Sequence, residues 1–150
     1  MKSPKVLKGK GFTLIETIIA VAILTILASL GLVFGIDYYK SYSLNAEQNM
    51  VISVFQKARS RAQNNINQSP HGVSLQPNSY VIFQGSSYAS RNVAYDQTVP
   101  KNPAIGVSGI SEATFEQLNG NSQTVGDIVL DNGKRTATIS INNEGRINWQ

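Results

Sequence analysis

Residues 12–36 constrain the fold of this chain more than any other stretch. They contain no Lys, Arg or Pro and carry a single charge, on Glu16. As an α-helix rising ~1.5 Å per residue, this run is roughly 37 Å long, enough to cross a ~30 Å hydrocarbon core with some tilt. It therefore predicts a transmembrane helix at residues 12–36. Four basic residues lie ahead of it, and they are Lys2, Lys5, Lys8 and Lys10.

A cleaved secretory signal peptide is the first alternative, and it fits poorly. The apolar run is longer than the apolar region of such peptides, and no small-x-small cleavage site follows it. The small residue that suits a peptidase, Gly11, lies before the run. A cut after Gly11 would remove residues 1–11 as a basic leader and leave Phe12 as the first residue of a membrane-anchored protein.

The segment Lys10-Gly11-Phe12-Thr13-Leu14-Ile15-Glu16 resembles the prepilin cleavage motif of type IV pilins and type II secretion pseudopilins. The resemblance implies that a membrane-embedded aspartyl prepilin peptidase cuts after Gly11 and methylates the new amine of Phe12. It also implies the partners, which are other pilin or pseudopilin subunits, the peptidase and an inner-membrane assembly platform. The alternative is that Gly11 only interrupts the helix.

The net charge of +4 is a property of the leader. Four of the 13 basic residues lie in residues 1–11, so nine basic residues face nine acidic ones after cleavage. The basic balance of the precursor is therefore no argument for a nucleic-acid partner. Because lysines beside a membrane segment tend to stay cytoplasmic, the N-terminus is expected inside the inner membrane and the residues from Asp37 onward outside it. The chain has no Cys, which excludes disulfides and thiolate chemistry.

Glu16 is the one carboxylate in the apolar run. A charge at the edge of a membrane span is costly unless it is paired, which makes Glu16 a functional candidate. It lies about one turn beyond Phe12, so its expected partner in assembly is the Phe12 amine of its own or a neighbouring subunit. The alternative is a glutamate that reaches the lipid headgroups.

Gly31 and Gly35 have a GxxxG spacing, which permits close helix contact or a local bend. Many pilins have a proline in this helix, and residues 12–36 have none, so a proline kink is not expected. Incidental glycines in an ordinary helix are the alternative.

Residues 37–68 are expected to continue the helix as an amphipathic segment, because they contain no Gly or Pro. The helix would run from Phe12 to about Ile66 and end at the Pro70–Gly72 turn. Its apolar stripe at helical spacing consists of Leu44, Val51, Phe55, Ala58, Ala62 and Ile66.

Residues 69–150 are expected to form a β-rich globular domain. The predicted strands are residues 73–75, 80–83, 113–118, a hairpin of 128–130 with 136–141 around Asn132-Gly133, and 146–149. Residues 86–109 are predicted to be a long loop with short strand pieces. One long helix followed by an antiparallel sheet is an α+β fold.

Segments 58–62, 73–75 and 145–147 resemble, more diffusely, the H-type pseudopilins and FimT-like minor pilins. FimT-like pilins bind DNA through basic residues that include a C-terminal Gly-Arg-x-Arg pattern. Here Gly145-Arg146-Ile147-Asn148 keeps the first arginine and lacks the second. The DNA-binding candidates are therefore Lys57, Arg59, Arg61 and Arg146, and the alternative is that these are ordinary solvated charges.

No other pattern indicates chemistry. Asp127, Asp131 and Asn132 match no calcium loop, and His71 is expected in a loop without ligand partners. No nucleophile elbow, phosphate loop or zinc spacing is present, so no enzyme, metal or cofactor is expected. The sequence predicts a structural subunit, a minor pilin or pseudopilin, with a DNA-binding minor pilin for DNA uptake as the alternative and an enzyme as the third class.

Overall fold

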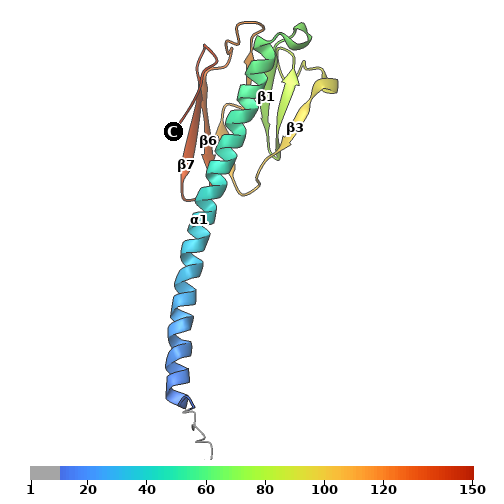
Figure 1. Cartoon of the computed structure of the whole chain (residues 1–150). Coiled ribbons are helices and arrows are strands. Elements are labelled where there is room, and N and C mark those ends of the chain that lie inside the picture. Colours follow the sequence, from blue (N-terminus) through green and yellow to red (C-terminus); the bar gives the residue numbers. More distant parts are fainter. Residues whose placement is uncertain (1–10) are drawn as a thin grey trace, which may run out of the picture. The chain divides into compact units, whose positions relative to one another are not determined.

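The computed structural model describes residues 11–150, apart from the side chains of residues 31–35. Its contacts divide the chain into two compact units, one ending at Tyr38 and one spanning Tyr39–Gln150. The helix α1 (Leu14–Gln63) contributes to both units (Figure 1). The elements after it are η1 (Ile66–Gln68), β1 (His71–Gln76), β2 (Ser79–Gln84), η2 (Val93–Tyr95), β3 (Gln97–Pro100), β4 (Gly106–Gly109), β5 (Glu112–Phe115), β6 (Gly126–Asp131), β7 (Thr136–Ile141) and β8 (Ile147–Trp149).

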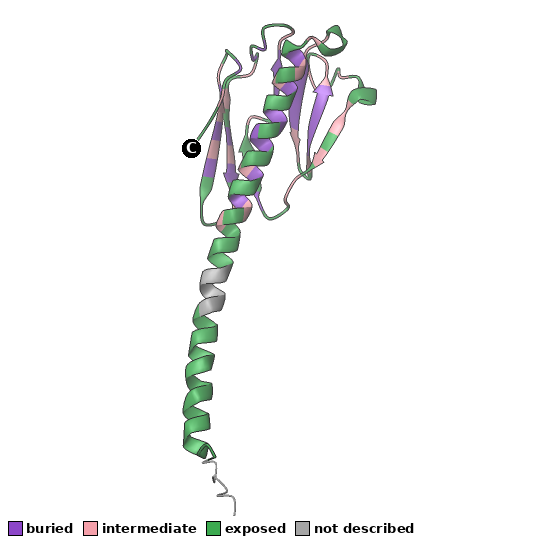
Figure 2. Cartoon of the chain, viewed as in Figure 1, coloured by how far each residue is buried: buried purple, intermediate pink, exposed green. Residues whose placement is uncertain are grey.

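In the first unit, α1 exposes its apolar side chains on every side. All residues from 11 to 30 are exposed (Figure 2), and large side chains such as Phe12 and Ile15 keep 87% and 61% of their surface accessible. The helix begins at Leu14, two residues later than the predicted start at Phe12. The apolar surface of residues 12–30 thus finds no cover within the described part of this chain.

In the second unit, α1 is amphipathic and buries one face. The predicted stripe residues Leu44, Val51, Phe55, Ala58 and Ala62 are all buried, which confirms the helical spacing. The sixth member of the stripe was predicted wrongly, because Ile66 is 44% exposed. The chain leaves the helix at Gln63, and Asn65 takes a left-handed conformation with φ 52°, so the helical periodicity no longer applies at Ile66.

The strands form two antiparallel sheets, where a single sheet was predicted. The first sheet has the order β3-β2-β1-β5 and the second the order β4-β6-β7-β8. An isolated bridge pairs Phe115 of β5 with Ser122, which lies in the segment between β5 and β6. The α+β class is confirmed, with one long helix packed on antiparallel sheets.

The predicted hairpin is confirmed, and the bounds of several strands are corrected. Strand β6 pairs with β7 up to Asp131 opposite Thr136, which leaves a four-residue turn where only Gly133 has a positive φ, 82°. The strand predicted at 113–118 spans Glu112–Phe115, because a turn follows at residues 117–119, where Leu118 is left-handed with φ 69°. The predicted loop 86–109 contains η2, β3 and β4, and the last strand starts at residue 147 rather than 146.

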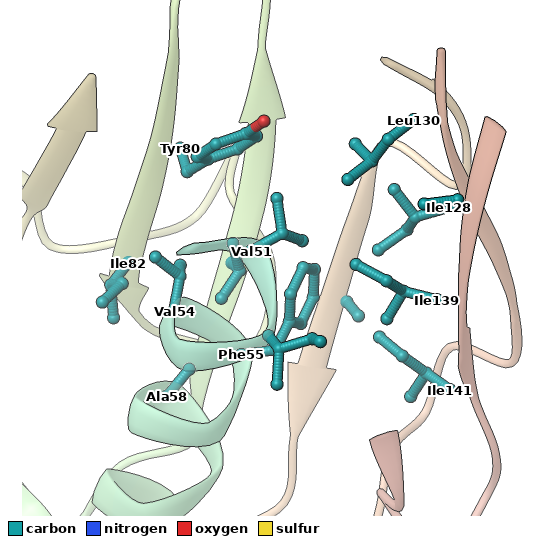
Figure 3. Close-up of a cluster of buried hydrophobic side chains, with 14 of the residues drawn as sticks. Val51, Val54, Phe55, Ala58, Tyr80, Ile82, Ile128, Leu130, Ile139 and Ile141 are labelled. Atoms are coloured by element: carbon teal, nitrogen blue, oxygen red, sulfur yellow. The ribbon is translucent and has the colours of Figure 1, made fainter. Parts of the chain in front are cut away.

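The core is built where α1 meets both sheets. Figure 3 shows side chains of α1 lying between Tyr80 and Ile82 of β2 on one side and the β6 and β7 side chains on the other. Phe55 packs edge-on against Phe115, with ring centroids 6.4 Å apart and an interplanar angle of 80°. This central position of α1 explains why its stripe is almost fully buried.

One carboxylate lies inside this core. Glu47 is buried, and its Oε1 accepts hydrogen bonds from the Tyr80 hydroxyl at 2.6 Å and from the Asn102 backbone N–H at 3.2 Å. Burial and the neighbouring Glu47 carboxylate raise the pKa of the Tyr80 hydroxyl well above its usual value. The pair therefore links α1, β2 and the loop before β4 through a satisfied polar contact.

Candidate functional site

Thr13 and Glu16 build the start of α1. The Glu16 Oε2 accepts hydrogen bonds from the Thr13 backbone N–H and from the Thr13 hydroxyl, each at 2.8 Å. The Glu16 backbone N–H donates in return to Thr13 Oγ1 at 3.3 Å. This reciprocal arrangement is a capping box, with Thr13 at the N-cap and Glu16 at the third helical position. The Thr-x-x-Glu spacing signals it in the sequence, where it was missed.

Glu16 therefore holds the first turn of α1 in the uncut chain. Its predicted partner, the Phe12 amine, forms only when the bond after Gly11 is cut, because the Phe12 nitrogen is otherwise a peptide N–H. The pairing of Glu16 with that amine stays a prediction. The capping box shows that the carboxylate is already held at the helix end that faces Phe12.

Gly11 packs against none of the residues that the structure describes. A Cβ built at Gly11 meets no heavy atom within 4 Å, and its φ lies outside the left-handed region. Gly11 and Phe12 are both exposed and lie ahead of the helix. Packing among the described residues therefore gives no reason for a glycine at this position.

The apolar part of α1 was predicted to be a transmembrane helix at 12–36. Over the residues that the structure describes, no helix combines the length and the hydropathy that crossing a bilayer requires.

Gly31 and Gly35 were predicted as a place of helix contact or bending. Their side-chain environment lies outside the described residues, so this stays a prediction.

The basic residues predicted as DNA-binding candidates do not form one patch. Arg59 donates from Nη2 to the Glu144 carbonyl at 2.9 Å and from Nε to the Gly120 carbonyl at 3.2 Å. Arg61 donates to Gln97 Oε1 at 2.9 Å, on the side of β3, and Lys57 is exposed.

Only two of the four candidates come together. Arg59 of α1 and Arg146, which directly precedes β8, line one groove. Arg146 also pairs with Glu144, with Nε to Oε2 at 3.1 Å, and both side chains are largely exposed. The groove is thus polar, and its two cations already have oxygen partners.

The residues near the β6–β7 turn are structural. Asn132 Oδ1 accepts hydrogen bonds from the backbone N–H groups of Lys134 and Arg135, and its amide donates to the Lys40 carbonyl at 2.9 Å. Asp131 Oδ1 accepts from the Gly133 N–H. Among the described residues, no group of His, Asp or Glu side chains is placed to hold a metal ion.

His71 lies in β1, where a loop position was predicted, and it is only 3% exposed. Burial lowers the pKa of His71; the Ser69 carbonyl, 3.0 Å from Nδ1, opposes this shift, and Arg61 adds to it. His71 is therefore a buried structural side chain that favours its neutral form.

A pH dependence of stability follows from His71. Because its pKa is lower in the folded state, the unfolded chain binds the proton first, and the free energy of unfolding should fall as the pH drops below ~6.5. Chemical unfolding of the detergent-solubilised chain between pH 7.5 and 5.5 measures this slope. The His71→Gln variant should show a flatter slope, and an unchanged slope would contradict the assignment to His71.

Comparison with known proteins identifies one segment. Residues 7–32 match the family model of the prokaryotic N-terminal methylation motif. The match includes Gly11, Phe12, the capping box and the exposed apolar part of α1, and it supports a pilin-like or pseudopilin-like subunit. No curated protein and no solved structure matches the chain.

Proposed function

We propose that this chain is a structural subunit, a minor pilin or pseudopilin, of a type IV pilus or a type II secretion pseudopilus. A prepilin peptidase cuts it after Gly11 and methylates Phe12, and the subunit then assembles through its N-terminal helix. The observation that carries the proposal is the methylation motif at residues 7–32. The exposed, packing-free Gly11–Phe12 bond at the start of α1 supports it.

The exposed surface of α1 supports assembly as the role of residues 12–36. Fully burying one large aliphatic side chain contributes about 1.5–3 kcal/mol. The side chains of residues 12–30 are exposed, so they need lipid before assembly and other helices after it. During assembly, neighbouring helices replace the lipid around this surface. In that step Glu16 pairs with a Phe12 amine and so sets the register between adjacent helices.

The proposed location is the inner membrane, with a single pass. Lysines at positions 2, 5, 8 and 10 keep the leader cytoplasmic, and the second unit, Tyr39–Gln150, is exported. In this role the chain is a substrate of the peptidase and methyltransferase and catalyses no reaction itself.

Co-expression of the chain with a prepilin peptidase tests the proposal. The mature protein should begin at Phe12, carry one methyl group on its amine and enter a sedimentable filament fraction with companion subunits. A chain that keeps residues 1–11 beside an active peptidase that cuts a known prepilin would overturn it.

A DNA-binding minor pilin is the second candidate, favoured by the groove that Arg59 and Arg146 share. Phosphate contacts would make such binding strongly salt-dependent. The full chain should then retain DNA at low salt and lose it on Arg146→Ala, while Lys101→Ala, at another groove, should have no effect. Absence of retention at low salt would remove this candidate.

A further inference from the structure

The part of α1 that opens the second unit exposes two aromatic side chains. Tyr39 and Tyr42 are 69% and 64% exposed. They are three residues apart on α1 and therefore lie on the same side of the helix. Together with Ala46 and Met50 they line a shallow groove. In the sequence, these tyrosines follow directly on the apolar run that ends at residue 36.

The β6–β7 turn brings basic side chains to the same end of the second unit. The Asn132 amide holds this turn on α1 through the Lys40 carbonyl at 2.9 Å, and Figure 1 shows the turn beside the helix. The same side chain fixes the backbone of Lys134 and Arg135, with N–H to Oδ1 distances of 3.0 and 2.8 Å. Lys40 and Arg135 are exposed, and Asp131 is the exposed acidic residue of the turn.

We propose that this end of the second unit docks on the headgroups of an anionic phospholipid membrane. We call it the basal face and define it by Tyr39, Lys40, Tyr42, Lys134 and Arg135. The inference rests on the membrane stage of the proposed function and adds a second contact with the same bilayer. The folded second unit lies on the membrane surface until the subunit is assembled.

The chemistry of the basal face favours lipid as the occupant. Tyrosine has an apolar ring and a polar tip, and it is enriched at the boundary between hydrocarbon and water. Lys and Arg are attracted to anionic headgroups, with a range of about 10 Å at ordinary ionic strength. The face carries two tyrosines and three basic residues, against Asp131 of the turn and Asp37, three positions before Lys40 in the sequence. Basic residues still outnumber acidic ones, so the charge complements an anionic surface. A second copy of α1 is the competing occupant.

A single fluorescent probe can report what covers the face. The chain has one tryptophan, Trp149, so Trp149→Phe provides a silent background for Tyr42→Trp. The full chain is reconstituted in vesicles of phosphatidylcholine with phosphatidylglycerol, and in phosphatidylcholine alone. In the anionic vesicles, the emission at position 42 should shift to the blue and be quenched by lipids brominated near the headgroup. Tyr95→Trp on the same background, at the exposed η2, is the matched control and should stay water-exposed.

The charge requirement is tested separately. Lys40→Glu combined with Arg135→Glu should reduce the blue shift at position 42 to the level seen in phosphatidylcholine alone. Arg146→Glu changes an exposed arginine outside the basal face and should leave the shift unchanged. Equal loss in both variants would show a general charge effect and would overturn the assignment to this face.

The outcomes separate this inference from the proposed function. If the chain resists alkaline carbonate extraction but position 42 stays water-exposed in both lipids, the basal-face inference fails and the membrane stage stands. If carbonate extracts the chain, the membrane stage fails and the inference falls with it. If the probe is shielded only at high protein-to-lipid ratios, a second copy covers the face and lipid docking is wrong.

Discussion

Replacing Gly11 by valine is expected to leave residues 1–11 on the protein. A Cβ at position 11 meets no heavy atom of the described residues within 4 Å, so the variant should fold and unfold like the original. A branched side chain beside the bond to be cut should obstruct a narrow peptidase cleft. We expect processing to slow by more than about tenfold, which corresponds to about 1.4 kcal/mol in the transition state. Mass spectrometry of the chain co-expressed with the peptidase measures the uncut fraction.

The control for Gly11 is a glycine outside the site. At Gly106 in β4, an added Cβ makes only ordinary contacts, the nearest at 3.5 Å, so Gly106→Ala should fold and be processed normally. Cleavage of Gly11→Val at the original rate would show that the peptidase does not read this position. The proposed cleavage site would then be wrong.

Replacing Glu16 separates two roles of the same carboxylate. Glutamine can still accept a hydrogen bond from the Thr13 N–H, so Glu16→Gln should keep the capping box, whereas Glu16→Val should lose it. Neither variant can form an ion pair with the Phe12 amine. Loss of one partner of a buried pair costs about 3–5 kcal/mol. Both variants should be cut after Gly11, yet enter filaments more than about a hundredfold less well in a sedimentation assay.

Two further variants complete the Glu16 test. Thr13→Val removes the capping hydroxyl but keeps the charge, so it should weaken the helix start by about 1 kcal/mol and still assemble. Asp127→Asn removes an exposed carboxylate of the second unit and should have no effect. If Glu16→Gln assembled like the original, Glu16 would act through the cap alone, and the pairing with the amine would be rejected.

The sequence predicts the helix well because its signal is local. The stripe from Leu44 to Ala62 repeats at helical spacing, and each member is buried. The prediction failed at Ile66, where the left-handed backbone at Asn65 changes the direction of the chain. A single left-handed residue of this kind leaves no trace in the spacing of apolar residues, so the spacing could not predict it.

The division of the strands into two sheets was not predictable in the same way. Strand partners are chosen by contacts between distant residues, such as Val73 with both Ile82 and Ala113. Strands β3 and β4 are short edge strands whose side chains are half-buried or exposed, so residues 86–109 lack the apolar alternation that marks a strand.

The residues of the candidate site could be named from the sequence, but their geometry could be predicted only in part. The heptapeptide at residues 10–16 pointed to Gly11, Phe12 and Glu16, and the family match covers the same positions. The role of Thr13 as a cap is readable from its spacing to Glu16. In contrast, two contacts bring together residues that are far apart in the sequence and could not be predicted from local patterns. Arg59 lines a groove with Arg146, and the Asn132 amide donates to the Lys40 carbonyl.

The central position of α1 also determines when the domain can fold. This helix precedes every strand, so its apolar stripe is synthesised first, and domains generally fold as units from the N-terminal end. Part of its cover comes from β6 and β7, and β7 contributes Ile139 and Ile141. The core therefore cannot close before β7, Thr136–Ile141, has been synthesised. A chain that ends before Thr136 leaves part of the stripe uncovered and is a misfolding hazard.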